Sequence, residues 1–142
     1  MHPVAERLIK LLLTRKHEFA EFDKRLNKLG HSLQCATRAL QADETPDYVV
    51  MCLFHDVFGG FEPLQHGNMA GVVLRPFIGM KALMACYEHP FAMQDLLEGK
   101  PPPEAPNAAW DFVTKYDHPS FDPDYETLDL AYFLPIIEAV IK

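Results

Sequence analysis

The side chains with the clearest capacity for chemistry are histidines and aspartates. Six of them recur along the chain in an order that suits a metal site: His31, His55, Asp56, His66, His89 and Asp117. His55 and Asp56 directly follow the apolar run of residues 49–54. Two adjacent ionisable groups are expensive to bury unless they are paired or bound to a metal. Taken singly, each histidine also fits a plain structural role, so the inference rests on the six together.

The elements that must position these side chains are expected to be helices. Apolar residues recur every three or four positions in residues 4–14, and again in residues 18–40, which contain His31. The second helix is expected to be either straight or bent at Gly30. The next segment begins with the helix-start signal Thr45-Pro46 and closes at Gly59 and Gly60. This helix is expected to end just past Asp56. A strand is the alternative for its valine-rich run.

Further helices are expected in the second half of the chain. A short one covers residues 66–77 and is interrupted near Pro76, and another begins at Gly79 and carries His89 near its end, because a proline follows it. A proline-rich loop separates these from the last elements: a helix over 107–117, an irregular stretch over 118–129 and a final apolar helix over 131–142. The sum predicts one all-α domain over residues 1–142, with six or seven helices.

Composition excludes several classes of protein. Of the 142 residues, 49% are hydrophobic and 23% charged, which is ordinary for a globular chain, and the net charge is −7 with scattered basic residues. Nucleic-acid binding is therefore not expected. No apolar run is long enough for a membrane span and no cleavage site follows the first apolar stretch, so a cytoplasmic location is expected. Cys35, Cys52 and Cys86 form no C-x-x-C pair and fit reduced core residues.

Five short segments resemble the HD-domain superfamily: H-S-L-Q at 31–34, L-F-H-D at 53–56, Q-H-G-N-M-A-G at 65–71, Y-E-H at 87–89 and Y-D-H-P-S-F-D-P at 116–123. Within it they are most similar to the branch of mixed-valent di-iron oxygenases that act on myo-inositol and on hydroxylated phosphonates. The resemblance covers about residues 23–135 and implies a compact HD-domain helical bundle.

The resemblance also implies a ligand set. The first metal would be held by His31, His55, Asp56 and Asp117, and the second by His66 and His89, with Asp56 bridging the two. Two iron ions, Fe(II) and Fe(III), are the implied cofactors, and manganese, magnesium or another divalent metal is the alternative. Imidazole and carboxylate ligands without thiolate suit iron, manganese or zinc.

The implied activity is that of an oxygenase that uses dioxygen to cleave a C–C or C–P bond of a small hydroxylated molecule, with a phosphonate as one option. A metal-dependent phosphohydrolase with the same ligands is the alternative enzyme, and a catalytically idle metal-binding domain is the alternative outside enzymes. Arg38, two turns beyond His31, and His118, beside Asp117, are candidate substrate contacts, although His118 equally fits a loop cap. The residues leave the substrate and the oligomeric state open.

Overall fold

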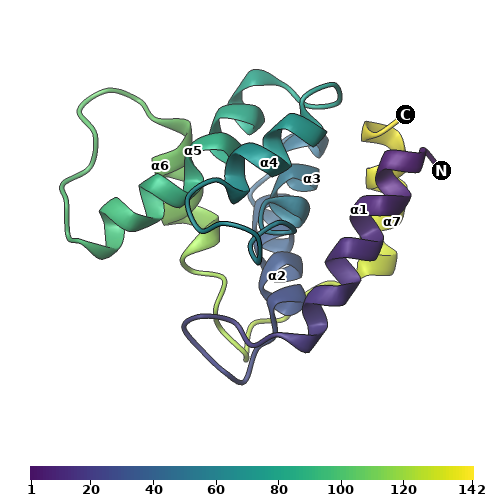
Figure 1. Ribbon diagram of the computed structural model, residues 1–142, viewed down its shortest axis with the longest axis horizontal. Helices are drawn as coiled ribbons and strands as arrows, with labels where there is room; N and C mark the ends of the chain where they lie inside the picture. Colours follow the sequence, from purple (N-terminus) through teal and green to yellow (C-terminus); the bar gives the residue numbers. More distant parts are fainter.

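A computed structural model describes all 142 residues as an all-helical fold without β-sheet (Figure 1). Its seven α-helices are α1 (Pro3–Thr14), α2 (Lys28–Gln41), α3 (Pro46–Phe54), α4 (His66–Leu74), α5 (Met80–Leu97), α6 (Ala108–Phe112) and α7 (Leu130–Val140). A 3-10 turn, η1 (Arg15–His17), follows α1, and a π-helical turn, η2 (Val113–Asp117), continues α6. The predicted all-α class with six or seven helices is confirmed.

Helix α3 lies at the centre of the packing. Every residue from Tyr48 to Phe54 is buried, so this helix has no polar face to turn to solvent. It packs against α2, α5 and α7, while α4 and α6 both pack against α5. In Figure 1, α1 and α7 lie on one side of α2 and α3, and α4, α5 and α6 lie on the other. Side chains and turns that project from α3 therefore enter the middle of the fold.

Side-chain caps fix where several helices begin. Asn27 accepts a hydrogen bond from the Gly30 amide at 2.7 Å, which starts α2. The helix predicted over residues 18–40 is therefore wrong for residues 18–27. Those residues instead reverse the chain direction: the Lys28 amide donates to the Glu18 carbonyl at 2.9 Å, and Phe19 and Asn27 form an isolated β-bridge. The reversal returns the chain from η1 to the start of α2.

Two other helix ends differ from the sequence-based expectation. Helix α3 ends at Phe54, so His55 and Asp56 lie in the turn just after the helix. Helix α5 does not end near His89, since it continues through Pro90 to Leu97. The strand alternative for α3 is wrong. The proline-rich loop before α6 and the irregular stretch before α7 are as predicted, and no helix has the length and apolar character that crossing a membrane requires.

Candidate metal centre

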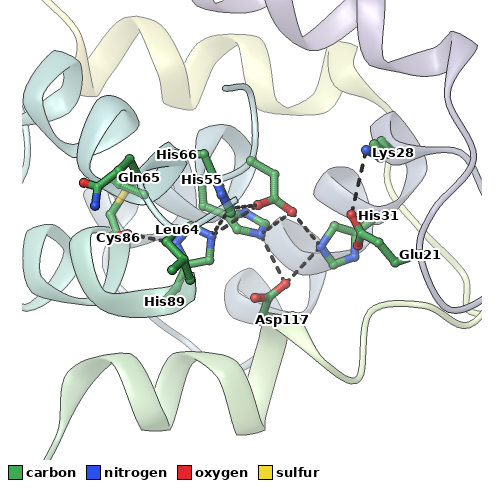
Figure 2. Close-up of polar contacts among 12 residues, drawn as sticks. Glu21, Lys28, His31, His55, Leu64, Gln65, His66, Cys86, His89 and Asp117 are labelled. Atoms are coloured by element: carbon green, nitrogen blue, oxygen red, sulfur yellow. Dashed lines mark hydrogen bonds and ion pairs between the residues drawn. The ribbon is translucent and has the colours of Figure 1, made fainter. Parts of the chain in front are cut away.

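The six predicted ligands lie together at the centre of the fold, in two groups that share Asp56. Figure 2 labels the other five: His31, His55, His66, His89 and Asp117. The first group comprises His31, His55, Asp56 and Asp117, and the second comprises Asp56, His66 and His89. Within each group all the ligand atoms lie within 4.8 Å of one another. His31, His55, His89 and Asp117 are buried, whereas Asp56 and His66 are half-buried. Both groups have a composition and spacing that could hold a metal ion.

Asp56 gives one carboxylate oxygen to each group. Its Oδ2 lies 3.1 Å from Nε2 of His55 and 3.4 Å from Nε2 of His31. Its Oδ1 lies 3.0 Å from Nε2 of His66 and 3.2 Å from Nε2 of His89. A single carboxylate that faces two ligand groups in this way has the geometry of a bridging ligand.

The π-helical turn η2 delivers Asp117 to the first group. Its Oδ1 lies 3.0 Å from Nε2 of His31 and 3.2 Å from Nε2 of His55. The His118 amide donates to the carbonyl of Val113, five residues earlier, at 2.9 Å, which widens this turn relative to an α-helix. One-turn π segments are frequent at functional sites because they re-aim a side chain without ending the helix.

All four imidazole rings are oriented in the same way by backbone carbonyls. Each Nδ1 faces one: the Ser120 carbonyl for His31 (2.8 Å), Cys52 for His55 (2.6 Å), Cys86 for His89 (2.8 Å) and Glu62 for His66 (3.3 Å). A carbonyl oxygen can only accept, so Nδ1 carries the proton and donates it. In the neutral ring the lone pair is then on Nε2, which faces the carboxylates. Metal-binding histidines characteristically have their second ring nitrogen held in this way.

The Cys86 carbonyl, which orients His89, has no helical hydrogen bond because residue 90 is a proline. In a regular helix the amide of residue 90 would donate to the Cys86 carbonyl, but proline has no N–H. Nδ1 of His89 takes that carbonyl instead. His55 uses a similar opportunity, because the Cys52 carbonyl lies in the last turn of α3, where carbonyls have no helical partner.

Two glycines let α4 approach α5 closely beside the second group. A Cβ on Gly67 would lie 2.4 Å from the Cys86 carbonyl oxygen, and one on Gly71 would lie 2.3 Å from the Tyr87 ring. Neither position has room for any other residue. The close approach leaves the ring centroids of His66 and His89 only 4.7 Å apart.

The electrostatics of the site favour positive charge. Burial acts to lower the pKa of His31, but the carboxylates of Asp117 and Asp56 outweigh it and raise the pKa to about 10. Burial acts to raise the pKa of Asp117, and the charge of His55 together with the contact to His31 lowers it instead. The two carboxylates thus raise the pKa of His31, His55 and His66, whereas burial outweighs the contact with Asp56 at His89 and lowers its pKa. A metal cation would likewise neutralise the negative charge of the two carboxylates.

Two contacts among the neutral side chains would be relieved by a proton or by a metal ion. Nε2 of His66 and Nε2 of His89 lie 2.9 Å apart, although both rings carry their proton on Nδ1 when neutral. Nε2 of His31 is buried and makes no hydrogen bond of acceptable geometry, even with Asp117 at 3.0 Å. Facing lone pairs repel unless a proton or a cation lies between them. Nitrogen and oxygen donors without thiolate match first-row metals such as iron, manganese and zinc.

A cavity of about 330 Å³ opens onto the ligands. Asp56, His66 and His89 line it together with apolar side chains that include Met93 and Phe121. Phe121 also stacks on His31, with the ring centroids 4.0 Å apart. A small molecule in this cavity would reach both ligand groups.

Arg38 and His118, the two candidate substrate contacts, do not line the cavity. The Arg38 guanidinium lies over the Tyr125 ring, 3.9 Å from its centroid, and donates to Gln34 at 3.3 Å. The His118 ring packs edge-on against Phe22, 5.4 Å between centroids. The three cysteines are buried and none belongs to either ligand group, in agreement with their interpretation as core residues.

Arg15, which the sequence reasoning did not single out, lines the same cavity and is buried. A signal for it was present: Arg15 follows Leu8 and Leu12 at the i, i+4, i+7 spacing of a helix face, and both leucines are buried. A charged residue in line with a buried apolar face is a candidate for a functional position.

The chain matches no family model, and a search of curated proteins finds no match. The class of site therefore rests on the geometry: a buried histidine and aspartate cluster in an all-helical fold, in which two groups could each hold a metal ion.

Proposed function

We propose that the chain is an HD-type di-iron oxygenase that uses dioxygen to cleave a C–C or C–P bond of a small hydroxylated molecule. The observation that carries the proposal is the shared Asp56, whose two oxygens face separate ligand groups. In two-metal enzymes the ions lie ~3.5–4 Å apart and act on one substrate together. A bridging carboxylate is the simplest means of holding them at that spacing.

The composition of the second group supports iron. It consists of two histidines and one carboxylate, the ligand set found in non-heme Fe(II) oxygenases, which leaves metal positions open for substrate and dioxygen. Across both groups four imidazoles accompany two carboxylates. Magnesium and calcium prefer sites made of oxygen ligands, so the nitrogen-rich set favours a transition metal.

The site residues would have different roles according to how deeply they are buried. Iron ions held here would supply the redox chemistry with dioxygen. His66 and Asp56 are half-buried and line the cavity, so they would present the second group to an incoming substrate. His31 and His55 are fully enclosed and would hold the deeper ion. Met93 and Phe121 would exclude water from the walls around the substrate.

Metal analysis combined with electron paramagnetic resonance tests the proposal. Protein expressed in iron-replete medium and partly oxidised by air is expected to contain about two irons per chain, in keeping with a two-metal site. It should show a signal of antiferromagnetically coupled Fe(II)/Fe(III) that changes when hydroxylated phosphonates or polyols are added. A single iron, or two redox-silent ions at every stage of a reductive titration, would contradict the oxygenase.

A metal-dependent phosphohydrolase is the second candidate, because the same bridged arrangement can activate a water molecule for attack on a phosphate ester. The first group, with its two carboxylates, would also suit manganese. Hydrolysis of p-nitrophenyl phosphate by the Mn(II)-loaded protein under strict exclusion of dioxygen would favour this candidate. Metal binding without turnover in either assay would leave an idle metal-binding domain.

A further inference from the structure

We propose that Arg15 anchors an anionic group of the substrate in the metal cavity, so that the substrate is a small hydroxylated acid. The proposal rests on the proposed function and narrows its substrate class to molecules with an oxyanion, either a carboxylate or a phosphonate or phosphate group. Arg15 is the only lysine or arginine that lines the cavity, alongside the ligands Asp56 and His66.

The Arg15 side chain is buried to a degree that is rare for arginine. The residue is 8% exposed, and its Nε is buried without any hydrogen-bond partner. Its one ion pair joins a terminal guanidinium nitrogen to Glu18 at 2.7 Å. A guanidinium has five N–H donors in a planar fork that matches an oxyanion. One terminal nitrogen is paired with Glu18 and Nε is enclosed, so the other terminal nitrogen is available to a ligand in the cavity.

The position of the guanidinium is fixed by Gly59 and Gly60. A Cβ on Gly59 would lie 2.9 Å from one terminal nitrogen of Arg15, and a Cβ on Gly60 would lie 3.2 Å from the other. The guanidinium thus rests directly against this backbone, in the turn that follows Asp56. The absence of side chains here gives Arg15 its place beside the metal ligands.

Glu18 does not use up the charge of Arg15. Lys28 shares Glu18, with Nζ 3.6 Å from its carboxylate, and also lies 3.8 Å from the Glu21 carboxylate; Figure 2 shows the contact between Lys28 and Glu21. Arg15, Lys28, Glu18 and Glu21 thus form a cluster of two cations and two anions, of which Arg15 and Glu21 line the cavity. The carboxylates of Asp56 and Asp117 also line it, and metal ions bound there would offset their negative charge. The cavity volume of about 330 Å³ corresponds to roughly ten water molecules at ~30 Å³ each. It suits a compact acid.

Isothermal titration calorimetry on the iron-loaded protein without dioxygen tests the anchor. The probes are hydroxymethylphosphonate, glycolate and the neutral ethylene glycol, and the variants are Arg15→Met, Arg15→Lys and Lys16→Met. Lys16 is the exposed neighbour in sequence and serves as the matched control for loss of one positive charge. Arg15→Met should weaken binding of the preferred acid by about tenfold or more, as expected for a charge-assisted hydrogen bond.

The other samples complete the test. Arg15→Lys should retain part of the affinity, Lys16→Met all of it, and ethylene glycol should respond to none of the variants. The tighter of the two acids identifies the anionic group. Equal affinity of wild type and Arg15→Met for both acids, or no acid binding by the wild type, would overturn the anchor.

Two further measurements separate loss of the Arg15 anchor from misfolding and from loss of metal. Gly60→Ala serves as the test if Arg15→Met does not fold. It displaces the guanidinium but keeps its charge, so it should also weaken acid binding. The metal content of every sample is measured in parallel. Arg15-dependent acid binding by a chain that holds no metal would contradict the proposed function and leave the anion site standing, whereas full metal content with no effect of Arg15 would contradict the anchor alone.

Discussion

Asp56 is the residue on which both ligand groups depend, since no other side chain is common to them. Its two oxygens face four imidazole nitrogens at 3.0 to 3.4 Å. His66, by contrast, belongs to one group only. The two residues therefore separate a shared ligand from an unshared one, and substitutions at them should change the number of bound metals differently.

Asp56→Asn is expected to abolish retention of both metals, while His66→Ala should reduce the content from about two per chain to about one. Metal analysis after desalting measures both, and His118→Ala, outside the ligand set, should leave the content unchanged. Retention of two metals by Asp56→Asn would show that the carboxylate does not bridge.

At the scale of elements, sequence patterns predicted helices well where apolar spacing governs and poorly where tertiary contacts do. The apolar α3 and the start of α7 follow from composition and turn signals. Residues 18–27 continue the apolar spacing of α2, yet the Asn27 cap and the chain reversal determine their structure. Pro90 disfavours a helix locally, but packing of α5 against α4 and α6 keeps the helix intact.

Pro90 offers a test of how one helix orients its ligand. In Pro90→Ala the new amide would donate to the Cys86 carbonyl and compete with Nδ1 of His89. We expect metal affinity at the second group to fall by roughly tenfold, in line with the loss of a partner that orients a metal ligand, while stability of the metal-free chain is unchanged or higher. Competition with a chromophoric chelator measures the affinity.

Pro135→Ala is the matched control, because Pro135 also lies inside a helix, α7, and contributes no ligand. Its metal affinity should equal that of the wild type. An unchanged affinity in Pro90→Ala as well would mean that the freed carbonyl plays no part in orienting His89.

Gly67 tests the contact between α4 and α5. A methyl group at this position would lie 2.4 Å from the backbone oxygen of Cys86, so Gly67→Ala must push the helices apart. We expect a loss of about 1–3 kcal/mol in the free energy of unfolding together with loss of the second metal. Urea unfolding of the metal-free protein gives the first quantity. Val72→Ala, at an exposed position of α4, should leave the second metal in place, and wild-type stability of Gly67→Ala would contradict the close approach.

At the scale of the whole molecule, the fold brings ligands from α2, the turn after α3, α4, α5 and η2 to one point. The residue types and their order indicated a metal site, because buried ionisable groups need partners wherever they meet, and the resemblance to HD-domain proteins implied the ligand set. The helix-face spacing of Arg15 indicates that it is buried, but its approach to the metal ligands was not predictable, since it depends on the path of residues 18–27 and on the backbone at Gly59. Local patterns indicate the ligands of the site, while the walls of its cavity are a property of the assembled fold.

Metal removal should make the stability of the whole molecule depend on pH in a defined direction. The pKa of His31 is raised from 6.5 to about 10, because its carboxylate neighbours outweigh the effect of burial. A group whose pKa is raised on folding stabilises the fold fully below its unfolded pKa, and this contribution is lost as the pH rises through the folded value. The chelator-treated protein should therefore lose stability between pH 6.5 and 10. In the metal-loaded protein a cation would take the place of the proton on Nε2, so stability should stay level over this range. Urea unfolding with and without chelator measures the difference, and parallel curves for the two forms would count against a metal bound by His31.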